Sequence, residues 1–231
     1  MNLNTVKLDI IDSTSTYAKE NAASLPLPSL ITARGQTDGR GRTGRKFYSP
    51  EGTGLYMTLL TEAPAGYDLI TPAAAVCVCK ALEELLSVKL DIKWVNDIFL
   101  NGRKVCGILS EKFTCEGRAL ISIGIGINLT TQAFPDDIPQ AGSLGAQIDP
   151  QALAESISAR ILKTLEKNDS EKILASYRER MFILGKEISF RINGKEMTGI
   201  ASGINGNGNL EVKTDGGTIT LSSGEISIGI R

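Results

Sequence analysis

The sequence predicts an α+β protein built from two units, a sheet-and-helix unit over residues 1–184 and a strand-only unit over residues 185–231. Apolar residues follow helical and strand periods in alternation as far as Leu184. After Leu184 only short strands are expected, because turn signals recur at short intervals. These signals stand at 193–194, 205–208, 215–217 and 223–224. Such spacing is typical of a small barrel or sandwich.

The first elements expected are a strand at 5–11 and a helix that begins after residues 12–14. Aspartate, serine and threonine at these positions supply the side-chain oxygens that cap a helix N-terminus. The helix is expected to run to about Ser24, because two prolines follow it. A short strand at 30–33 then leads into a loop rich in glycine and arginine.

A β-prone run at 54–61 precedes a long helix that opens at Thr71-Pro72. One stripe of this helix is apolar and is expected to be buried. The stripe consists of Ala74, Val78, Leu82, Leu85 and Leu86.

Asn101-Gly102 predicts a tight hairpin, because Asn-Gly adopts the positive φ angles of a two-residue turn. The pair joins short strands within 91–100 to a return strand at 104–111. A further strand is expected at 119–129. A loop at 130–149 and helices at about 150–167 and 169–182 follow.

Composition excludes several kinds of chemistry. The 231 residues include no histidine, which rules out a Ser-His-Asp triad and a histidine-ligated metal site. The 25 basic and 26 acidic side chains give a net charge of −1, so no general attraction to nucleic acid is expected. The four cysteines fit no zinc spacing and are expected to be free thiols, and no metal site is expected.

Neither a membrane anchor nor a secretion signal is evident in the sequence. No apolar run is long enough to cross a bilayer, and the N-terminus lacks a basic start followed by an apolar stretch. We therefore expect a cytoplasmic protein without a membrane partner.

Three glycines and three arginines lie within Gly39–Arg45, on a chain that is otherwise nearly neutral. Glycine lets backbone N–H groups approach a ligand, and arginine supplies planar donors that match carboxylate and phosphate oxygens. The loop predicts a cradle for one small anion such as ATP or an acyl-adenylate. A solvated basic loop and an RNA contact are the alternatives.

The strand at 121–129 has two different faces. Four isoleucines and Leu129 share a face that must be buried. Ser122, Gly124, Gly126 and Asn128 share the other face. A glycine face indicates close approach by another group. That group is either a planar ligand ring, with Asn128 reading its polar edge, or a tightly packed helix.

Lys93–Asp97 ends one strand of the predicted hairpin, and Lys104 begins the other. A lysine ammonium there can bridge a carboxylate and a phosphate. Asp97 can orient that lysine or accept a proton from an incoming amine. The alternative is a surface hairpin with solvated charges.

Taken in order, these pieces resemble biotin–protein ligases. The matching stretches are DSTSTYAKE (12–20), GQTDGRGRTGRKFYSPEGTGLYMTLL (35–60), KWVNDIFLNGRKVCGILSE (93–111), GIGINL (124–129) and GEISI (224–228). The resemblance implies a catalytic domain related to class II aminoacyl-tRNA synthetases, followed by a small SH3-like barrel. It also implies the form that lacks an N-terminal DNA-binding domain, because the first motif begins at Asp12.

The same resemblance implies the activity and its partners. The expected enzyme, a biotin–[acetyl-CoA-carboxylase] ligase, activates biotin with ATP and Mg²⁺ to biotinyl-5′-AMP. It then transfers biotin to a lysine of a biotin carboxyl carrier domain. A homodimer is possible. A lipoate or octanoate ligase and a non-catalytic nucleic-acid-binding module are the competing hypotheses.

Site residues follow from the matched motifs, position by position. Catalytic roles are implied for Lys104, Arg40 and Asp97. Biotin contacts are implied for Ser13, Thr14, Ser15, Gln36, Gly39, Arg40, Gly41, Arg42, Lys104 and Gly107. Nucleotide contacts are implied for Arg40, Arg42, Arg45, Phe47, Asn96, Lys104 and Asn128. Three positions depart from the usual pattern: Ser15 replaces an asparagine, Phe47 a tryptophan and Val95 a proline.

Overall fold

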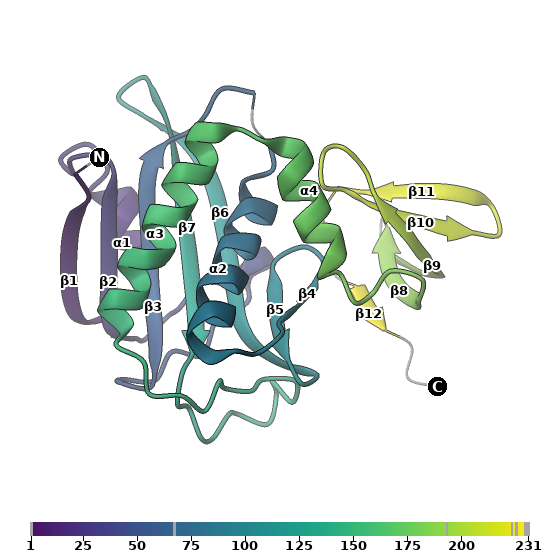
Figure 1. Cartoon of the computed structure of the whole chain (residues 1–231), viewed down its shortest axis with the longest axis horizontal. Helices are drawn as coiled ribbons and strands as arrows, with labels where there is room; N and C mark the ends of the chain where they lie inside the picture. Colours follow the sequence, from purple (N-terminus) through teal and green to yellow (C-terminus); the bar gives the residue numbers. More distant parts are fainter. Residues whose placement is uncertain (1, 67, 193, 223, 225, 229–231) are drawn as a thin grey trace.

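A seven-stranded mixed sheet forms the centre of the computed structural model, which describes residues 2–66, 68–192, 194–222, 224 and 226–228. The strand order is β1-β2-β3-β7-β6-β5-β4. Strands β1 and β2 pair in parallel, and the other neighbours pair antiparallel. Helices α2 and α3 cover one face and α1 lies on the opposite face (Figure 1).

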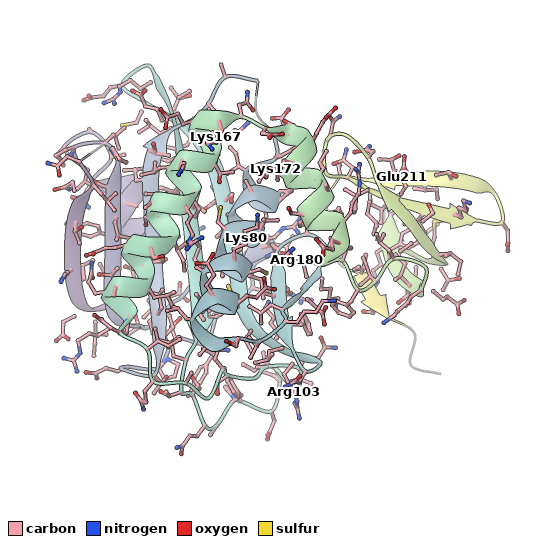
Figure 2. All side chains as sticks on the ribbon, viewed as in Figure 1. Lys80, Arg103, Lys167, Lys172, Arg180 and Glu211 are labelled. Carbon is pink, nitrogen blue, oxygen red and sulfur yellow. The ribbon has the colours of Figure 1, made fainter. Side chains whose placement is uncertain are left out.

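The strands of the large sheet are β1 (Asn4–Ile11), β2 (Ser29–Gln36), β3 (Gly54–Glu62), β4 (Asp91–Lys93), β5 (Asp97–Leu100), β6 (Arg103–Cys115) and β7 (Arg118–Asn128). The helices are α1 (Thr14–Glu20), α2 (Ile70–Leu86), α3 (Pro150–Lys167) and α4 (Ser170–Glu179), with a short 3-10 turn η1 (Arg42–Gly44). Figure 2 labels Lys80, Lys167 and Lys172 on the layer formed by α2, α3 and α4.

Alternation along the strands divides the apolar side chains between two clusters. Leu30 and Leu59 belong to the large cluster beneath α2 and α3, whereas Ile31 and Leu60 belong to a smaller cluster beneath α1. The isoleucine face of β7 joins the large cluster, as the sequence predicts. Each of its isoleucines is at most 2% exposed.

The C-terminal strands form a second, antiparallel sheet beside α4 (Figure 1). Its strands are β8 (Glu187–Ile192), β9 (Lys195–Ile204), β10 (Leu210–Thr214), β11 (Gly217–Leu221) and β12 (Ile226–Ile228), in the order β11-β10-β9-β8-β12. Three residues of the predicted turn and motif segments, Asn193, Ser223 and Glu225, lie outside the described residues.

Side-chain hydrogen bonds from Trp94 and Arg178 attach the second sheet to the first unit. The Trp94 indole N–H donates to the Gly208 carbonyl at 3.0 Å. The Arg178 guanidinium on α4 donates to the Ile204 carbonyl. The turn that carries Gly208 is therefore tied to the end of β4, next to the residues predicted to do chemistry.

Several predicted boundaries are wrong, and local bonding explains one of them. Helix α1 ends at Glu20 rather than at Ser24, because the Asn21 side chain donates to the Tyr17 carbonyl and closes the last turn. Helix α4 ends at Glu179, three residues early, and β6 continues four residues beyond Glu111 to Cys115. Leu85 was expected in the buried stripe of α2 but is 57% exposed.

None of the helices within the described residues is long and apolar enough to cross a membrane.

The four cysteines are free, and their exposure differs. Cys77, Cys79 and Cys106 are buried, and burial raises the pKa of each thiol, that of Cys79 to about 12. Cys115 is only partly buried.

We predict that one thiol per chain, Cys115, reacts rapidly with a thiol reagent in the native protein, because the thiolate is the reactive form. All four thiols react after denaturation. Absorbance of the released reagent anion measures both counts. Rapid reaction of two or more native thiols would contradict the burial described above.

Ile123→Val should lower the free energy of unfolding by about 0.5–1.5 kcal/mol, because it removes a methylene from a fully buried position on β7. Ile10→Val is the matched control, since Ile10 on β1 is 53% exposed. Urea denaturation of both variants measures the difference. Equal losses at the two positions would show that the β7 face is not the packed core.

Candidate active site

A cavity of about 410 Å³ lies between the large sheet, the glycine–arginine loop, the loop at 134–141 and strand β12. The start of α1 closes one end of it. All of the predicted site residues except Gly39 line this cavity. They are Ser13, Thr14, Ser15, Gln36, Arg40, Gly41, Arg42, Arg45, Phe47, Asn96, Asp97, Lys104, Gly107 and Asn128. Residues far apart in the sequence are thus brought together at one place.

The glycine face of β7 forms part of the cavity floor. A side chain at Gly124 would place its Cβ 2.6 Å from the Ser15 hydroxyl, and one at Gly126 would place its Cβ 2.4 Å from the Phe47 ring. Gly107 on β6 also approaches the Phe47 ring. The packed-helix interpretation is confirmed at Gly124, the group that approaches Gly126 is the Phe47 ring of the chain itself, and the ligand interpretation stays a prediction. The start of a helix packs against Gly124, and the cavity opens beside Gly126.

Hydroxyl groups gather at the α1 end of the cavity. The Ser13 side chain caps α1 by accepting hydrogen bonds from the Ser15 and Thr16 backbone N–H groups. Gln36 Oε1 accepts from the Thr14 backbone N–H at 2.9 Å and lies 3.2 Å from the Thr14 hydroxyl. Ser13, Thr14 and Ser15 are each at most 5% exposed. The capping motif thus starts the helix and also places polar groups at the cavity wall.

The glycine–arginine loop folds back on itself as a short ladder. The Gly41 N–H donates to the Arg45 carbonyl, and the Phe47 N–H donates to the Gly39 carbonyl, both at 2.7 Å. Gly39 is the one predicted site residue that does not line the cavity. Its Cβ would lie 2.5 Å from the Phe47 carbonyl, so this glycine shapes the loop instead.

Charges around the loop are partly paired. Lys46 lies 2.6 Å from Asp38, and this hydrogen bond and charge hold the pKa of the Asp38 carboxyl below its usual range. Arg42 donates to Asn96 Oδ1 at 3.3 Å, which joins the loop to the turn between β4 and β5.

Lys104 and Asp97 form an ion pair at the cavity wall, with 2.8 Å between Nζ and Oδ1. Asp97 lies opposite Gly107 and Lys104 opposite Phe99 in the β5–β6 pair, so the Lys104 side chain, which is 32% exposed, reaches along the strands to Asp97. Asn96 has a structural contact as well, since its amide donates to the Ile108 carbonyl at 2.8 Å. An ammonium held by a carboxylate at a cavity is suited to exchange that partner for an anionic ligand.

Sequence reasoning missed a whole wall of the cavity. The loop at 134–141 contributes Phe134 and Ile138, and β12 of the second sheet contributes Ile226 and Ser227. Arg103, at the lower edge of the sheet in Figure 2, donates to the Pro139 carbonyl and helps to hold this loop. Such a loop has no periodicity, and only the single aromatic Phe134 could have indicated it.

Asn128 makes a structural contact in addition to its predicted ligand contact, which stays a prediction. Its amide nitrogen donates to the Gly142 carbonyl at 2.8 Å, so that group is committed to holding the loop. Its Oδ1 is buried and has no hydrogen-bond partner within the described part of the chain. Only this oxygen remains to meet a polar ligand edge.

Comparison with known proteins assigns both parts of the chain. Residues 8–128 match the biotin/lipoate A/B protein ligase family, and residues 183–229 match the biotin protein ligase C-terminal domain. The chain is 30% identical over 97% of its length to the bifunctional ligase/repressor BirA of Salmonella typhimurium, and it covers 74% of that protein. It is 29% identical over 94% of its length to the biotin--[acetyl-CoA-carboxylase] ligase of Paracoccus denitrificans, of which it covers 98%.

A solved structure supports the same relationship. Biotin protein ligase from Aquifex aeolicus, in complex with biotin and ATP, matches this fold with a TM-score of 0.83 and 29% sequence identity. The match covers 98% of each chain.

Proposed function

Because the chain belongs to the biotin/lipoate A/B protein ligase family, we propose that it is an ATP-dependent biotin–protein ligase. It joins biotin to ATP as biotinyl-5′-AMP with release of pyrophosphate, and then transfers biotin to a lysine of a carrier protein. One observation carries the proposal: hydroxyl, glycine and cationic residues from separate stretches of chain meet around a single cavity.

The first step brings two anions together, since the biotin carboxylate attacks the α-phosphate of ATP. Negative charge grows on the phosphoryl oxygens as pyrophosphate leaves. Lys104 and Arg40 line the cavity and supply the positive charge that this step needs. A preorganised donor of this kind stabilises a transition state by about 2.7–4 kcal/mol. We propose that the Lys104 ammonium turns from Asp97 to the new anion.

In the second step, the amine of the carrier lysine attacks the acyl carbon of the adenylate and AMP leaves. The attacking amine must lose a proton. Asp97 is the carboxylate next to Lys104, and we propose that it accepts this proton once Lys104 has turned to the phosphate.

Magnesium is expected to arrive with the ATP phosphates. The described residues contain no cluster of three or more acidic or cysteine side chains that could hold a metal on its own. This chain's part is then to bind and orient the nucleotide, with Arg42, Arg45 and Phe47 as the proposed contacts.

The acceptor is a carrier protein, and its carboxyl-carrier identity remains a proposal. Homodimerisation also remains a prediction. Strands β1 and β4 end the large sheet, but Ile92 of β4 bridges to Met181. The β1 edge, with the exposed Ile10, is therefore the more accessible one for pairing between subunits.

Exchange of radiolabelled pyrophosphate into ATP tests the function directly. We expect exchange that depends on added biotin, because only adenylate formation is reversible in this way. Exchange with lipoate but not with biotin would move the assignment to the other branch of the family. Absence of exchange with either acid would contradict the proposal.

Lys104→Ala should slow biotin-dependent exchange by at least about a hundredfold while the protein stays folded. Lys112→Ala is the matched control. Lys112 lies on the same strand, pairs with Asp68 at 2.9 Å and does not line the cavity. Exchange near the wild-type rate in Lys104→Ala would remove Lys104 from the mechanism.

A further inference from the structure

A continuous chain of side-chain hydrogen bonds runs beneath the α1 end of the cavity. Ser15 Oγ lies 3.1 Å from Thr58 Oγ1, and Thr58 Oγ1 lies 2.9 Å from Thr14 Oγ1. The Thr14 hydroxyl then donates to Gln36 Oε1 at 3.2 Å. The Gln36 amide nitrogen donates to Ser49 Oγ, and the Ser49 hydroxyl donates to the Phe47 carbonyl, each at 2.9 Å.

Two backbone groups fix the direction of every bond in this chain. The Thr14 N–H can only donate, so the group of Gln36 that faces it must be the oxygen. The Phe47 carbonyl can only accept, so the Ser49 proton points to it. The Thr14 hydroxyl must therefore donate to Gln36, and its oxygen accepts from Thr58.

Thr58 has one proton, and that proton is committed to Thr14. The bond between Ser15 and Thr58 must then be donated by Ser15, although geometry alone allows either direction. The hydroxyl protons of Ser15 and Thr14 are consequently both used in hydrogen bonds to protein groups, those of Thr58 and Gln36, and are not available to a ligand. What these hydroxyls present to a ligand is lone pairs.

The Ser13 hydroxyl differs from those of Ser15 and Thr14, because its proton is available to a ligand. Its oxygen already accepts from two backbone N–H groups, and its proton is not donated to any other residue within the described ranges. The same end of the cavity therefore offers one hydroxyl donor beside two hydroxyl acceptors. A cyclic urea has the complementary pattern, with one carbonyl and two N–H groups.

Thr58 itself does not line the cavity. It is fully buried on β3, beside Gly124, where the absent side chain leaves room for the Ser15 hydroxyl. Its hydroxyl is the only link between Ser15 and Thr14 in this chain. It acts on a ligand through those two residues and without touching it.

We propose that Thr58 is a positioning residue for specificity: it commits the Ser15 and Thr14 protons, so the cavity selects an acid whose ring donates N–H groups. This inference rests on the proposed ligase function. It predicts discrimination against lipoate, whose dithiolane ring donates no hydrogen bond and would leave buried lone pairs unpaired.

Two substitutions at Thr58 separate the hydroxyl from the shape. Thr58→Val keeps the volume and removes the hydroxyl, whereas Thr58→Ser keeps the hydroxyl and removes a methyl group. In the exchange assay we expect KM for biotin to rise at least about tenfold in Thr58→Val and less than about threefold in Thr58→Ser. We expect kcat and KM for ATP to stay within about threefold in both variants.

A purely structural role for Thr58 predicts instead that a substitution raises KM for biotin and KM for ATP together and lowers kcat, because a general loss of stability affects the whole cavity. A larger rise in KM for biotin in Thr58→Ser than in Thr58→Val would overturn the inference. A parallel rise in KM for biotin and KM for ATP would also overturn it. Thr32→Val is the matched control. Thr32 is buried on the neighbouring strand β2, donates to Gln151 Oε1 at 3.2 Å and lies outside the cavity.

A measurement on the wild-type protein keeps the inference testable if Thr58→Val does not fold. The probe is a biotin analogue in which a cyclic carbonate replaces the urea, so that the carbonyl remains and both N–H groups are lost. We expect competition with biotin at least about a hundredfold weaker than that of unlabelled biotin. Equal competition would overturn the inference, while biotin-dependent exchange in the same preparation would leave the proposed function intact.

Discussion

The alternation of isoleucine and glycine along β7 is the constraint on which the rest of the structure depends. Its isoleucine face completes the core beneath α2 and α3. Its glycine face lets two groups approach the backbone more closely than any side chain would allow, the Ser15 hydroxyl at Gly124 and the Phe47 ring at Gly126. One strand therefore contributes both to the core of the large unit and to the floor of the cavity.

Polar contacts join segments of the cavity wall that are distant in the sequence. Arg42 of the glycine–arginine loop donates a hydrogen bond to Asn96, and Lys104 forms an ion pair with Asp97. Arg42 and Lys104 each have a polar or acidic partner before any ligand binds, so their side chains are held in place at the cavity. An entering carboxylate and phosphate can then replace those partners.

Local patterns in the sequence predicted the strands, the hairpin at Asn101-Gly102 and the two faces of β7, because each depends on residues that are near neighbours. The residues of the resemblance also converge as expected, apart from Gly39. The wall formed by the loop at 134–141 and by β12 was not predictable, since it depends on contacts such as Asn128 with Gly142. The role of Thr58 could not be predicted from the sequence either, because it depends on the position of this hydroxyl between Ser15 and Thr14.

A crystal structure with a non-reactive analogue of biotinyl-5′-AMP tests the central claim most directly. The account predicts the fused ring against Gly124 and the α1 hydroxyls, and a phosphate oxygen within hydrogen-bond distance of Lys104 Nζ and the Arg40 guanidinium. It also predicts that Lys104 has moved away from Asp97. An analogue bound outside this cavity, with the ion pair between Lys104 and Asp97 unchanged, would contradict it.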